Sequence, residues 1–334
     1  MSDRQDRLHL MATGYVEAKI LLAGVELGVF DHLRGDGTSA SFVAERIGGT
    51  LRGTEILLDA LTAAEIIDKR DALYRNRPEY EDRLVSDGTS HYASLLRHRN
   101  RLFRRWAFLE ETIRSDEALP EALCFSPRDD PRTNRDFIRA MVAVSGDRAA
   151  EIVAEIDLDG VRVVADLGGG PAHYLAEFLK RKPEIDPYLC DLPLTLEVAR
   201  SLHDGLPLGE KGHFIVWDLY SDAPPEELPP VDLAFVSQVL HGESPEANRA
   251  FLARLFERMA PGGRVVIHEN IVDPGRTTPR ESALFAVNML AMTCGGRTYT
   301  EAELHAWGTD AGFTPLPGRR IDARSFLVVL ARPL

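Results

Sequence analysis

The chain has 334 residues, 44% of them hydrophobic, and a formal net charge of −13 at pH 7. This length and composition are ordinary for a globular protein of roughly two domains. Nucleic acids and anionic membranes favour basic surfaces, so the acidic balance argues against both kinds of partner. We therefore expect a protein that acts on neither nucleic acid nor membrane.

The cysteines are few and widely spaced: Cys124, Cys190 and Cys294. They show neither the paired spacing of a zinc site nor a disulfide framework, and free thiols suit a reducing compartment. The charged N-terminus leads into no signal-type apolar segment, and no stretch approaches the roughly 20 apolar residues of a membrane-spanning helix. These features predict a cytoplasmic protein.

The first part of the chain predicts a winged helix. Residues 15–33, 41–47 and 53–61 place apolar residues at helical spacing, and residues 66–74 predict two short strands around a turn. The segment lacks the dense Lys/Arg stripe of a DNA-reading module, which favours a packing or dimerisation role. Several apolar side chains exceed what a small helical domain can bury alone, which predicts a homodimer. These are Leu21, Val25, Val29, Leu57 and Leu61.

Residues 90–155 are expected to be helical. A run of arginines between 97 and 105 alternates with apolar residues at helical spacing, which indicates an amphipathic helix with a solvated basic face. We expect a winged-helix dimerisation domain over 1–90 and a helical linker or substrate lid over 91–155. The catalytic domain would then occupy 156–334.

From Val161 the pattern changes to alternating strands and helices, which predicts a doubly wound α/β domain. Two further apolar runs at the end of the chain predict an antiparallel hairpin at the sheet edge, so the last strand is antiparallel. The expected strands are Val161–Asp166, Pro187–Asp191, His213–Asp218, Val231–Ser237, Gly263–Glu269, Thr314–Ile321 and Ser325–Ala331.

The most informative segment is the end of the first of these strands, where Asp166 is followed by three consecutive glycines, Gly168 to Gly170. A strand, a glycine turn and a helix form the front of a nucleotide-type binding unit. The turn lacks the G-x-G-x-x-G spacing, and Pro171 removes a backbone N–H that a pyrophosphate would use. The turn therefore favours an adenosyl ligand without phosphates.

Acidic residues recur at the strand ends, where open α/β sheets bind ligands. Asp191 ends the second strand and is placed to accept hydrogen bonds from ribose hydroxyls. Asp218 is placed to hold an adenine amino group, with Trp217 or Leu219 covering the ring. Any one such residue also fits a helix N-cap, but the recurrence favours a ligand site.

These motifs together resemble the S-adenosylmethionine-dependent small-molecule O-methyltransferases, a family of homodimers with a winged-helix dimerisation domain and a Rossmann-like catalytic domain. The resemblance rests on Asp166-Leu167-Gly168-Gly169-Gly170, Asp191-Leu192-Pro193, Trp217-Asp218-Leu219-Tyr220, Val239-Leu240-His241, Ala260-Pro261-Gly262-Gly263-Arg264, Glu269, Asn288-Met289-Leu290, Gly295-Gly296-Arg297 and Thr300-Glu301-Ala302-Glu303-Leu304.

The resemblance implies S-adenosylmethionine as cofactor and a small aromatic or polyketide-like hydroxyl compound as methyl acceptor. It implies that His241 is the general base and Glu269 the acid that orients it; an imidazole can accept a proton near neutral pH. The implied cofactor-binding residues are Asp166, Gly168, Gly170, Asp191, Asp218, Leu219, Ser145 and Ser237. The implied substrate-binding residues are Met141, Asn288 and Met292.

The chain departs from the family pattern around the base. The usual His-Asp-Trp is His241-Gly242-Glu243 here, and Thr298 stands where a second glutamate is common. These changes leave carbon methylation, or a reaction without methyl transfer, as alternatives on the same fold. His268 beside Glu269 raises the question of a metal site. Successive strand residues point to opposite faces, so we expect none.

Overall fold

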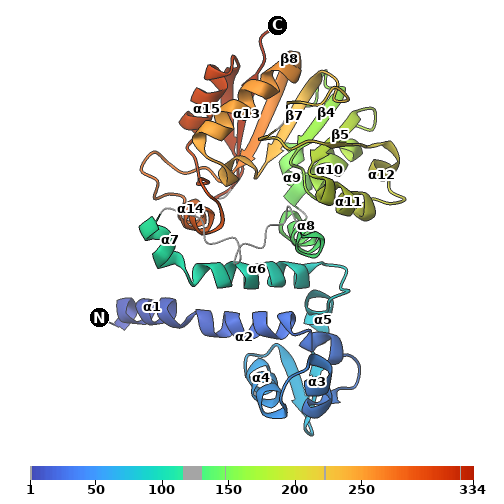
Figure 1. Ribbon diagram of the computed structural model, residues 1–334, viewed down its shortest axis with the longest axis vertical. Helices are drawn as coiled ribbons and strands as arrows, with labels where there is room; N and C mark the ends of the chain where they lie inside the picture. The colour runs from blue at the N-terminus through green and yellow to red at the C-terminus, as the bar shows by residue number, and fades with distance from the viewer. Residues whose placement is uncertain (1, 116–129, 147, 222, 324) are drawn as a thin grey trace. The chain divides into compact units, whose positions relative to one another are not determined.

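A seven-stranded sheet organises the C-terminal part of the computed structural model (Figure 1). Its strand order is β6-β5-β4-β7-β8-β10-β9, and the first five strands are parallel, while β10 runs antiparallel to both β8 and β9. The predicted α/β class with an antiparallel last strand is confirmed. The strands are β4 (Val163–Leu167), β5 (Asp186–Asp191), β6 (His213–Val216), β7 (Val231–Ser237), β8 (Met259–Glu269), β9 (Thr314–Arg320) and β10 (Phe326–Ala331).

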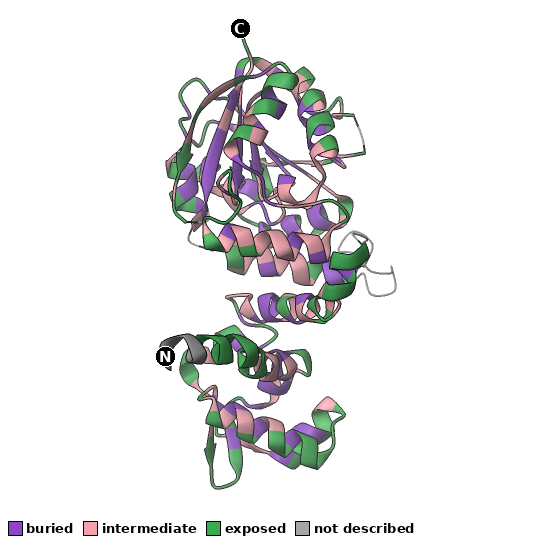
Figure 2. Cartoon of the chain, turned by 90° about the vertical axis from the view of Figure 1, so that its left-hand side faces the viewer, coloured by how far each residue is buried: buried purple, intermediate pink, exposed green. Residues whose placement is uncertain are grey.

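Helices cover both faces of this sheet, so its central strands are buried on two sides and read as continuous apolar runs. Figure 2 shows the buried strands between helices whose outer surfaces are exposed. One face packs against α13 and α15, and the other against α9 to α12. The helices beyond Trp106 are α7 (Leu109–Ser115), α8 (Pro131–Ser145), α9 (Arg148–Ala154), α10 (His173–Arg181), α11 (Pro193–Leu202), α12 (Pro207–Lys211), α13 (Pro245–Arg258), α14 (Arg280–Met292) and α15 (Glu301–Asp310).

The N-terminal part has the helices and hairpin of a winged helix. Asp71 and Ala72 both have positive φ, which is the backbone of a tight two-residue hairpin turn between β2 and β3. Ser39 and Thr50 cap α3 and α4 through their side-chain oxygens. The elements are α1 (Ser2–Thr13), α2 (Tyr15–Glu26), β1 (Thr38–Ser39), α3 (Ala40–Ile47), α4 (Leu51–Ala63), β2 (Ile67–Arg70), β3 (Leu73–Asn76), α5 (Pro78–Leu84) and α6 (Tyr92–Trp106), with a 3-10 turn at Val29–His32.

Two details of the N-terminal prediction are wrong. The helix expected over residues 15–33 ends at Glu26, because Gly28 adopts a left-handed conformation with φ of +73° and starts a separate 3-10 turn. The apolar residues that we expected to exceed what this domain can bury instead form its core. Val25, Val29 and Leu61 are buried, and Leu21 and Leu57 pack against them.

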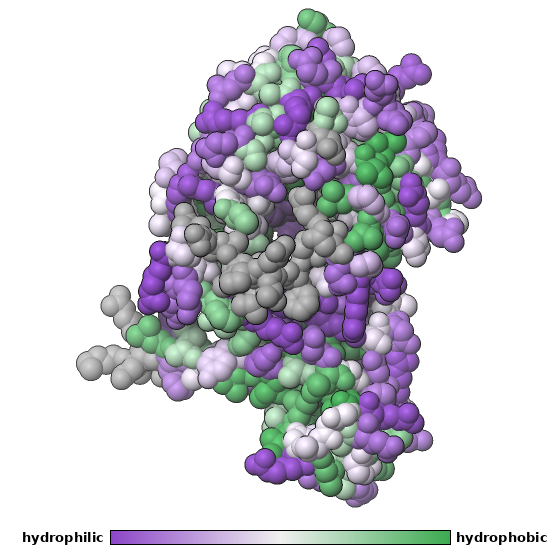
Figure 3. All heavy atoms as spheres, in the orientation of Figure 1, coloured by the Kyte–Doolittle hydropathy of each residue, from purple (hydrophilic) through white to green (hydrophobic). Residues whose placement is uncertain are grey.

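The most exposed large apolar side chains of this part lie on α1, and further ones stand at the start of α2. Leu8, Leu10 and Met11 are 66–70% exposed, and Tyr15 and Val16 follow them. Figure 3 shows hydrophobic residues gathered on the N-terminal part of the molecule. Contrary to the sequence-based expectation, the stretch Arg7–Glu26 is long and apolar enough to pass a length-and-composition test for a membrane span. The core helix of a soluble protein and a signal sequence have the same length and composition, so one such helix is weak evidence of a membrane span.

The structure describes residues 2–115, 130–146, 148–221, 223–323 and 325–334. Cys124 lies outside these residues. The chain forms two units by internal contacts, Met1–Arg104 with Arg139–Val144, and Arg105–Ile138 with Ser145–Leu334. The division at residues 90 and 155 expected from the sequence stays a prediction.

Candidate active site

The glycine turn after β4 is held against the end of β5 by a carboxylate. Asp191 accepts hydrogen bonds from the backbone N–H of Gly170 at 2.9 Å and of Leu192 at 2.7 Å. The N–H of Gly168 donates to the Cys190 carbonyl at 2.8 Å, so turn and strand end form one unit. Asp191 therefore fixes the turn as well as lying where a ribose would be held.

The three glycines differ in what surrounds them. A side chain on Gly169 would place its Cβ 2.4 Å from the Asp166 carboxyl carbon, so this glycine is required by packing. Gly170 has a φ of +54°, and a Cβ there would meet only the tip of Ile138 at 3.9 Å. The backbone at Gly170 thus faces open space, which fits the close approach of a ligand such as S-adenosylmethionine.

Asp166 is fully buried beneath this turn. Burial raises the pKa of Asp166 to about 8, and the negative charge of Asp191 adds to the shift. Asp166 is therefore largely protonated at neutral pH and can donate a hydrogen bond, whereas Asp191 accepts two. Because Asp166 is fully buried, only Asp191 of the pair can present its oxygens to a ligand at the strand ends.

The third expected cofactor contact follows β6. The Asp218 carboxylate accepts from the Tyr220 backbone N–H at 3.2 Å and from the Ser221 hydroxyl at 3.1 Å. Leu219 is buried, and its Cδ1 would lie 3.5 Å from a Cβ on Gly168. Leu219 therefore lies against the glycine turn, where an adenine ring packed on it would also be close to Asp218.

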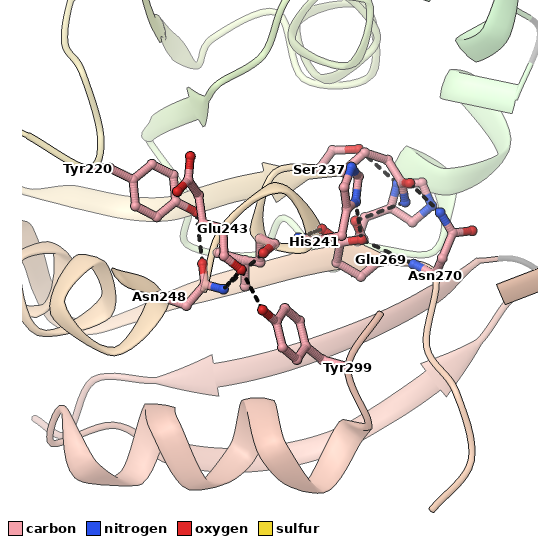
Figure 4. Close-up of polar contacts among 11 residues, drawn as sticks. Tyr220, Ser237, His241, Glu243, Asn248, Glu269, Asn270 and Tyr299 are labelled. Carbon is pink, nitrogen blue, oxygen red and sulfur yellow. Dashed lines mark hydrogen bonds and ion pairs between the residues drawn. The ribbon is translucent and has the colours of Figure 1, made fainter. Parts of the chain in front are cut away.

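At the other side of the same sheet edge, His241 and Glu269 form a buried pair (Figure 4). His241 lies in the 3-10 turn Leu240–Gly242 after β7, and Glu269 ends β8. The Nδ1 atom of His241 is 2.8 Å from Glu269 Oε2, and its backbone N–H donates to Glu269 Oε1 at 3.3 Å. The side chains are 13% and 4% exposed, so water competes little for the contact.

The electrostatics of the His241–Glu269 pair indicate which atom carries the hydrogen between them. Burial alone raises the pKa of Glu269, but the His241 charge and hydrogen bonds from His241 and the Asn270 backbone outweigh it, so the pKa is lowered overall. Glu269 is therefore a carboxylate and can only accept, which requires the Nδ1 atom of His241 to carry a hydrogen. In the neutral imidazole, the Nε2 atom then keeps a lone pair that can take up a proton.

A polar scaffold holds the turn that carries His241, and the sequence analysis missed it. Asn248, fully buried on α13, donates to the carbonyls of Leu240 at 2.9 Å and Glu243 at 3.3 Å. Tyr220 donates to Asn248 at 2.8 Å, and the Tyr299 hydroxyl donates to the Glu243 carbonyl (Figure 4). The turn that carries His241 is thus held by side chains from α13 and from the segment before α15.

The segment after α14 closes over the same turn. A Cβ on Gly296 would lie 2.3 Å from the His241 carbonyl oxygen, so only glycine permits this approach. Phe285 of α14 packs edge-on against the His241 ring, with centroids 4.9 Å apart. The motif Gly295-Gly296-Arg297 therefore has a packing reason that its sequence alone does not reveal.

His268 points away from the pair, as strand alternation predicts. Its Nδ1 atom is 2.9 Å from the Ser237 hydroxyl, on the face covered by α10, and burial lowers its pKa to about 4. His268 and Glu269 thus serve different contacts. Among the described residues, no group of three or more His, Cys, Asp or Glu side chains is arranged to hold a metal ion.

Comparison with known proteins agrees with this geometry. A family model described as the O-methyltransferase domain matches residues 111–314, and the O-methyltransferase dimerisation domain matches residues 9–81. The chain belongs to the O-methyltransferase family. The predicted enzyme class and the S-adenosylmethionine cofactor are confirmed at this level.

Individual relatives cover nearly the whole chain. The 3-hydroxy-5-methyl-1-naphthoate 3-O-methyltransferase of Streptomyces sahachiroi is 30% identical over 308 residues, 90% of this chain and 87% of that protein. The tetracenomycin polyketide synthesis 8-O-methyl transferase TcmO of Streptomyces glaucescens is 28% identical, covering 97% of this chain and 95% of its own. A solved structure described as PigF with SAH superposes with a TM-score of 0.87 at 26% identity, covering 99% and 100% of the chains.

The structure brings most of the expected O-methyltransferase site residues to one edge of the sheet. Asp191 and the glycine turn lie together, and His241 contacts Glu269. The roles given to each residue stay predictions, including those of Ser145 and Met141 on α8 and of Ser237. On α14, Asn288 and Met292 contact Trp106 and Arg105, two residues that the sequence analysis assigned only to an amphipathic helix.

Proposed function

We propose that this enzyme transfers a methyl group from S-adenosylmethionine to a hydroxyl of a small aromatic or polyketide-like compound, with His241 as general base. The observation that carries the proposal is the His241–Glu269 pair, in which an ionised glutamate fixes the hydrogen on Nδ1. The Nε2 atom then accepts the proton of the acceptor hydroxyl, and Glu269 stabilises the imidazolium that results.

The residues around the glycine turn fit the cofactor residue by residue. Asp191 would hold the ribose, Asp218 and Leu219 the adenine, and the backbone of the glycine turn at Gly168 and Gly170 the methionine part. When bound there, S-adenosylmethionine supplies an electrophilic methyl group on its sulfonium. The protein's own contribution is then to orient the acceptor oxygen and remove its proton as that oxygen attacks.

The acceptor class is supported by the side chains beside the base and by the relatives. Phe285 packs against His241, and the Streptomyces relatives are named for a hydroxynaphthoate and a polyketide. Flat aromatic acceptors suit such surroundings. The departures at Gly242, Glu243 and Thr298 support ring-carbon methylation as the second candidate, since that reaction also needs a proton acceptor.

Calorimetry and mass spectrometry test the proposal together. We expect S-adenosylhomocysteine to bind, and incubation with S-adenosylmethionine and hydroxyarenes to yield products heavier by one methyl group. Failure to bind either cofactor form would contradict the proposal. A methyl group found on carbon, by fragmentation of the product, would replace it with the second candidate.

We also propose that the enzyme is a homodimer, joined through α1 and α2. The support is the exposed apolar surface from Leu8 to Val16, which lies, apart from Leu8, within the segment that matches the dimerisation model. Sedimentation of the wild type at micromolar concentration should give a dimer, and Leu10→Glu should weaken it by introducing a charge into the contact. A wild-type monomer would contradict this assignment. The cytoplasmic location stays a prediction.

A further inference from the structure

A strip of half-buried side chains runs along one face of α14, starting at the catalytic pair. Phe285, Asn288 and Met292 are three and four residues apart, so they lie on one side of the helix. Phe285 contacts His241 at one end. Seven residues of helix rise about 10 Å, so the strip is about as long as a two-ring arene.

The far end of the strip is formed by two residues at the end of α6. Trp106 Nε1 donates to Asn288 Oδ1 at 3.1 Å, and Arg105 Nη1 donates to the Met292 carbonyl at 3.0 Å. Arg105 also lies 4.0 Å from the Met292 sulfur. Trp106 is 40% exposed, so one indole face is open to another ring.

The direction of these hydrogen bonds shows which polar groups at this end of the strip are left to bind a ligand. An indole N–H can only donate, so the Asn288 atom that faces Trp106 must be the oxygen. The amide NH₂ of Asn288 is therefore turned elsewhere, and no described residue accepts from it. Both free groups at this end of the strip, that amide and the guanidinium, are donors.

Arg105 also carries an uncompensated charge. One of the five N–H groups of Arg105 donates to the carbonyl of Met292, the last residue of α14. Within the parts of the chain that the structure describes, no carboxylate pairs with Arg105, although its neighbour Arg104 pairs with Glu26. A half-buried guanidinium beside an amide donor favours a planar carboxylate, which can accept two parallel hydrogen bonds.

Building on the proposed function, we propose that the acceptor is a hydroxyarene with a carboxylate at the end opposite the methylated hydroxyl, and that Arg105 and Asn288 bind this carboxylate. His241 would face the hydroxyl, Phe285 and Trp106 the rings, and Arg105 the acid. Arg105 is then a specificity-determining residue of the methyl transfer, with no part in the proton transfer itself.

The test measures acceptor binding in the presence of S-adenosylhomocysteine, where no methyl transfer occurs. The probes are 6-hydroxy-2-naphthoate, its methyl ester and 2-naphthol. Arg105→Gln should weaken binding of the naphthoate about tenfold or more, because a charge-assisted hydrogen-bond pair is lost. It should leave the ester and 2-naphthol within about twofold, and Arg104→Gln should leave all three unchanged.

A second variant covers the case in which Arg105→Gln loosens α14. Arg105→Glu should reverse the preference, binding 6-(aminomethyl)-2-naphthol more tightly than the naphthoate, which a merely structural role would not produce. Equal losses for all three probes, unchanged binding of the naphthoate, or no saturable naphthoate binding to the wild type would overturn the inference. Arg105-dependent binding without any methylated product would instead count against the proposed function.

Discussion

The two halves of the sheet's carboxyl edge are built in different ways. Around β4 and β5, the glycine turn and Asp191 come from one continuous stretch and meet largely through backbone N–H groups. Around β7 and β8, His241 is held by Glu269, Asn248 and Tyr299, which come from three separate elements. The first half is the proposed cofactor surface, built with backbone groups of one strand–helix–strand unit, and the second is the proposed reactive centre, built by side-chain contacts.

This contrast predicts that substitutions separate the two halves in their effects. Changes at the β4–β5 end should alter cofactor affinity, and changes at the β7–β8 end should alter turnover with the cofactor affinity kept. A substitution at one end that moved both quantities equally would show that the halves are coupled.

The largest effect is expected at Gly169. Gly169→Ala places a Cβ 2.4 Å from the Asp166 carboxyl carbon, so the enzyme should fail to fold or melt far below the wild type. Gly170→Ala is the matched comparison, because its Cβ meets open space and the variant carries only the strain of a side chain at a φ of +54°, about 1–2 kcal/mol. That variant should stay folded, by circular dichroism, and lose affinity for S-adenosylhomocysteine in calorimetry. Tight binding by Gly170→Ala would mean that the ligand does not occupy the open space beside Gly170.

Glu269→Gln should act on turnover. The amide keeps a hydrogen-bond partner for His241 Nδ1 but cannot stabilise the imidazolium, so kcat should fall on the order of 10²-fold. Affinity for S-adenosylhomocysteine should stay within about twofold if the halves are independent. Glu257→Gln, at an exposed position of α13, is the control and should leave both unchanged. A kcat near that of the wild type would remove Glu269 from the catalytic role.

Asn248 should have a smaller effect on the same half. Asn248→Leu removes the amide that donates to the Leu240 and Glu243 carbonyls, and only the Glu243 carbonyl keeps a second side-chain donor, Tyr299. The turn that carries His241 should therefore shift and kcat fall about tenfold. The melting temperature should also drop. Arg249→Gln, next along α13 in a surface ion pair with Asp310, controls for the helix itself. Unchanged kcat with lower stability would make Asn248 purely structural.

A last effect, on stability and not on turnover, is a pH dependence at Asp166. Folding raises its pKa from 3.8 to about 8, so folding takes up a proton between these values. The stabilisation is complete below the unfolded pKa and is lost as the pH rises through about 8. Asp166→Asn cannot ionise at this position. The melting temperature of the variant minus that of the wild type should therefore increase from pH 5 to pH 9. A constant difference would mean that Asp166 does not titrate in this range.

The same contrast explains what the sequence could predict. The strands and the glycine turn follow from local apolar patterns and from residues within about ten positions of one another. The resemblance to the family located His241 and Glu269, 28 residues apart. Trp106 and Asn288 are 182 residues apart, and Arg105 and Met292 are 187 apart, so no local pattern links them. Asn248 looked like any polar helix residue until its two carbonyl partners were in place.

The N-terminal part shows the same limit. Apolar residues such as Val25 and Leu61 have the spacing of a helix face, but spacing does not say whether that face meets the domain's own core or a partner. The structure places them inside and leaves Leu8 and Leu10 exposed on a helix that the sequence analysis did not predict.

The most direct test of the central claim compares two acceptors on His241→Gln at saturating S-adenosylmethionine. If His241 removes the hydroxyl proton, single-turnover transfer to a hydroxynaphthalene whose pKa lies above the assay pH should fall about 10³-fold. A nitro-substituted analogue that is already ionised should lose no more than about tenfold. Equal losses for the two acceptors would contradict the assignment of His241 as the general base.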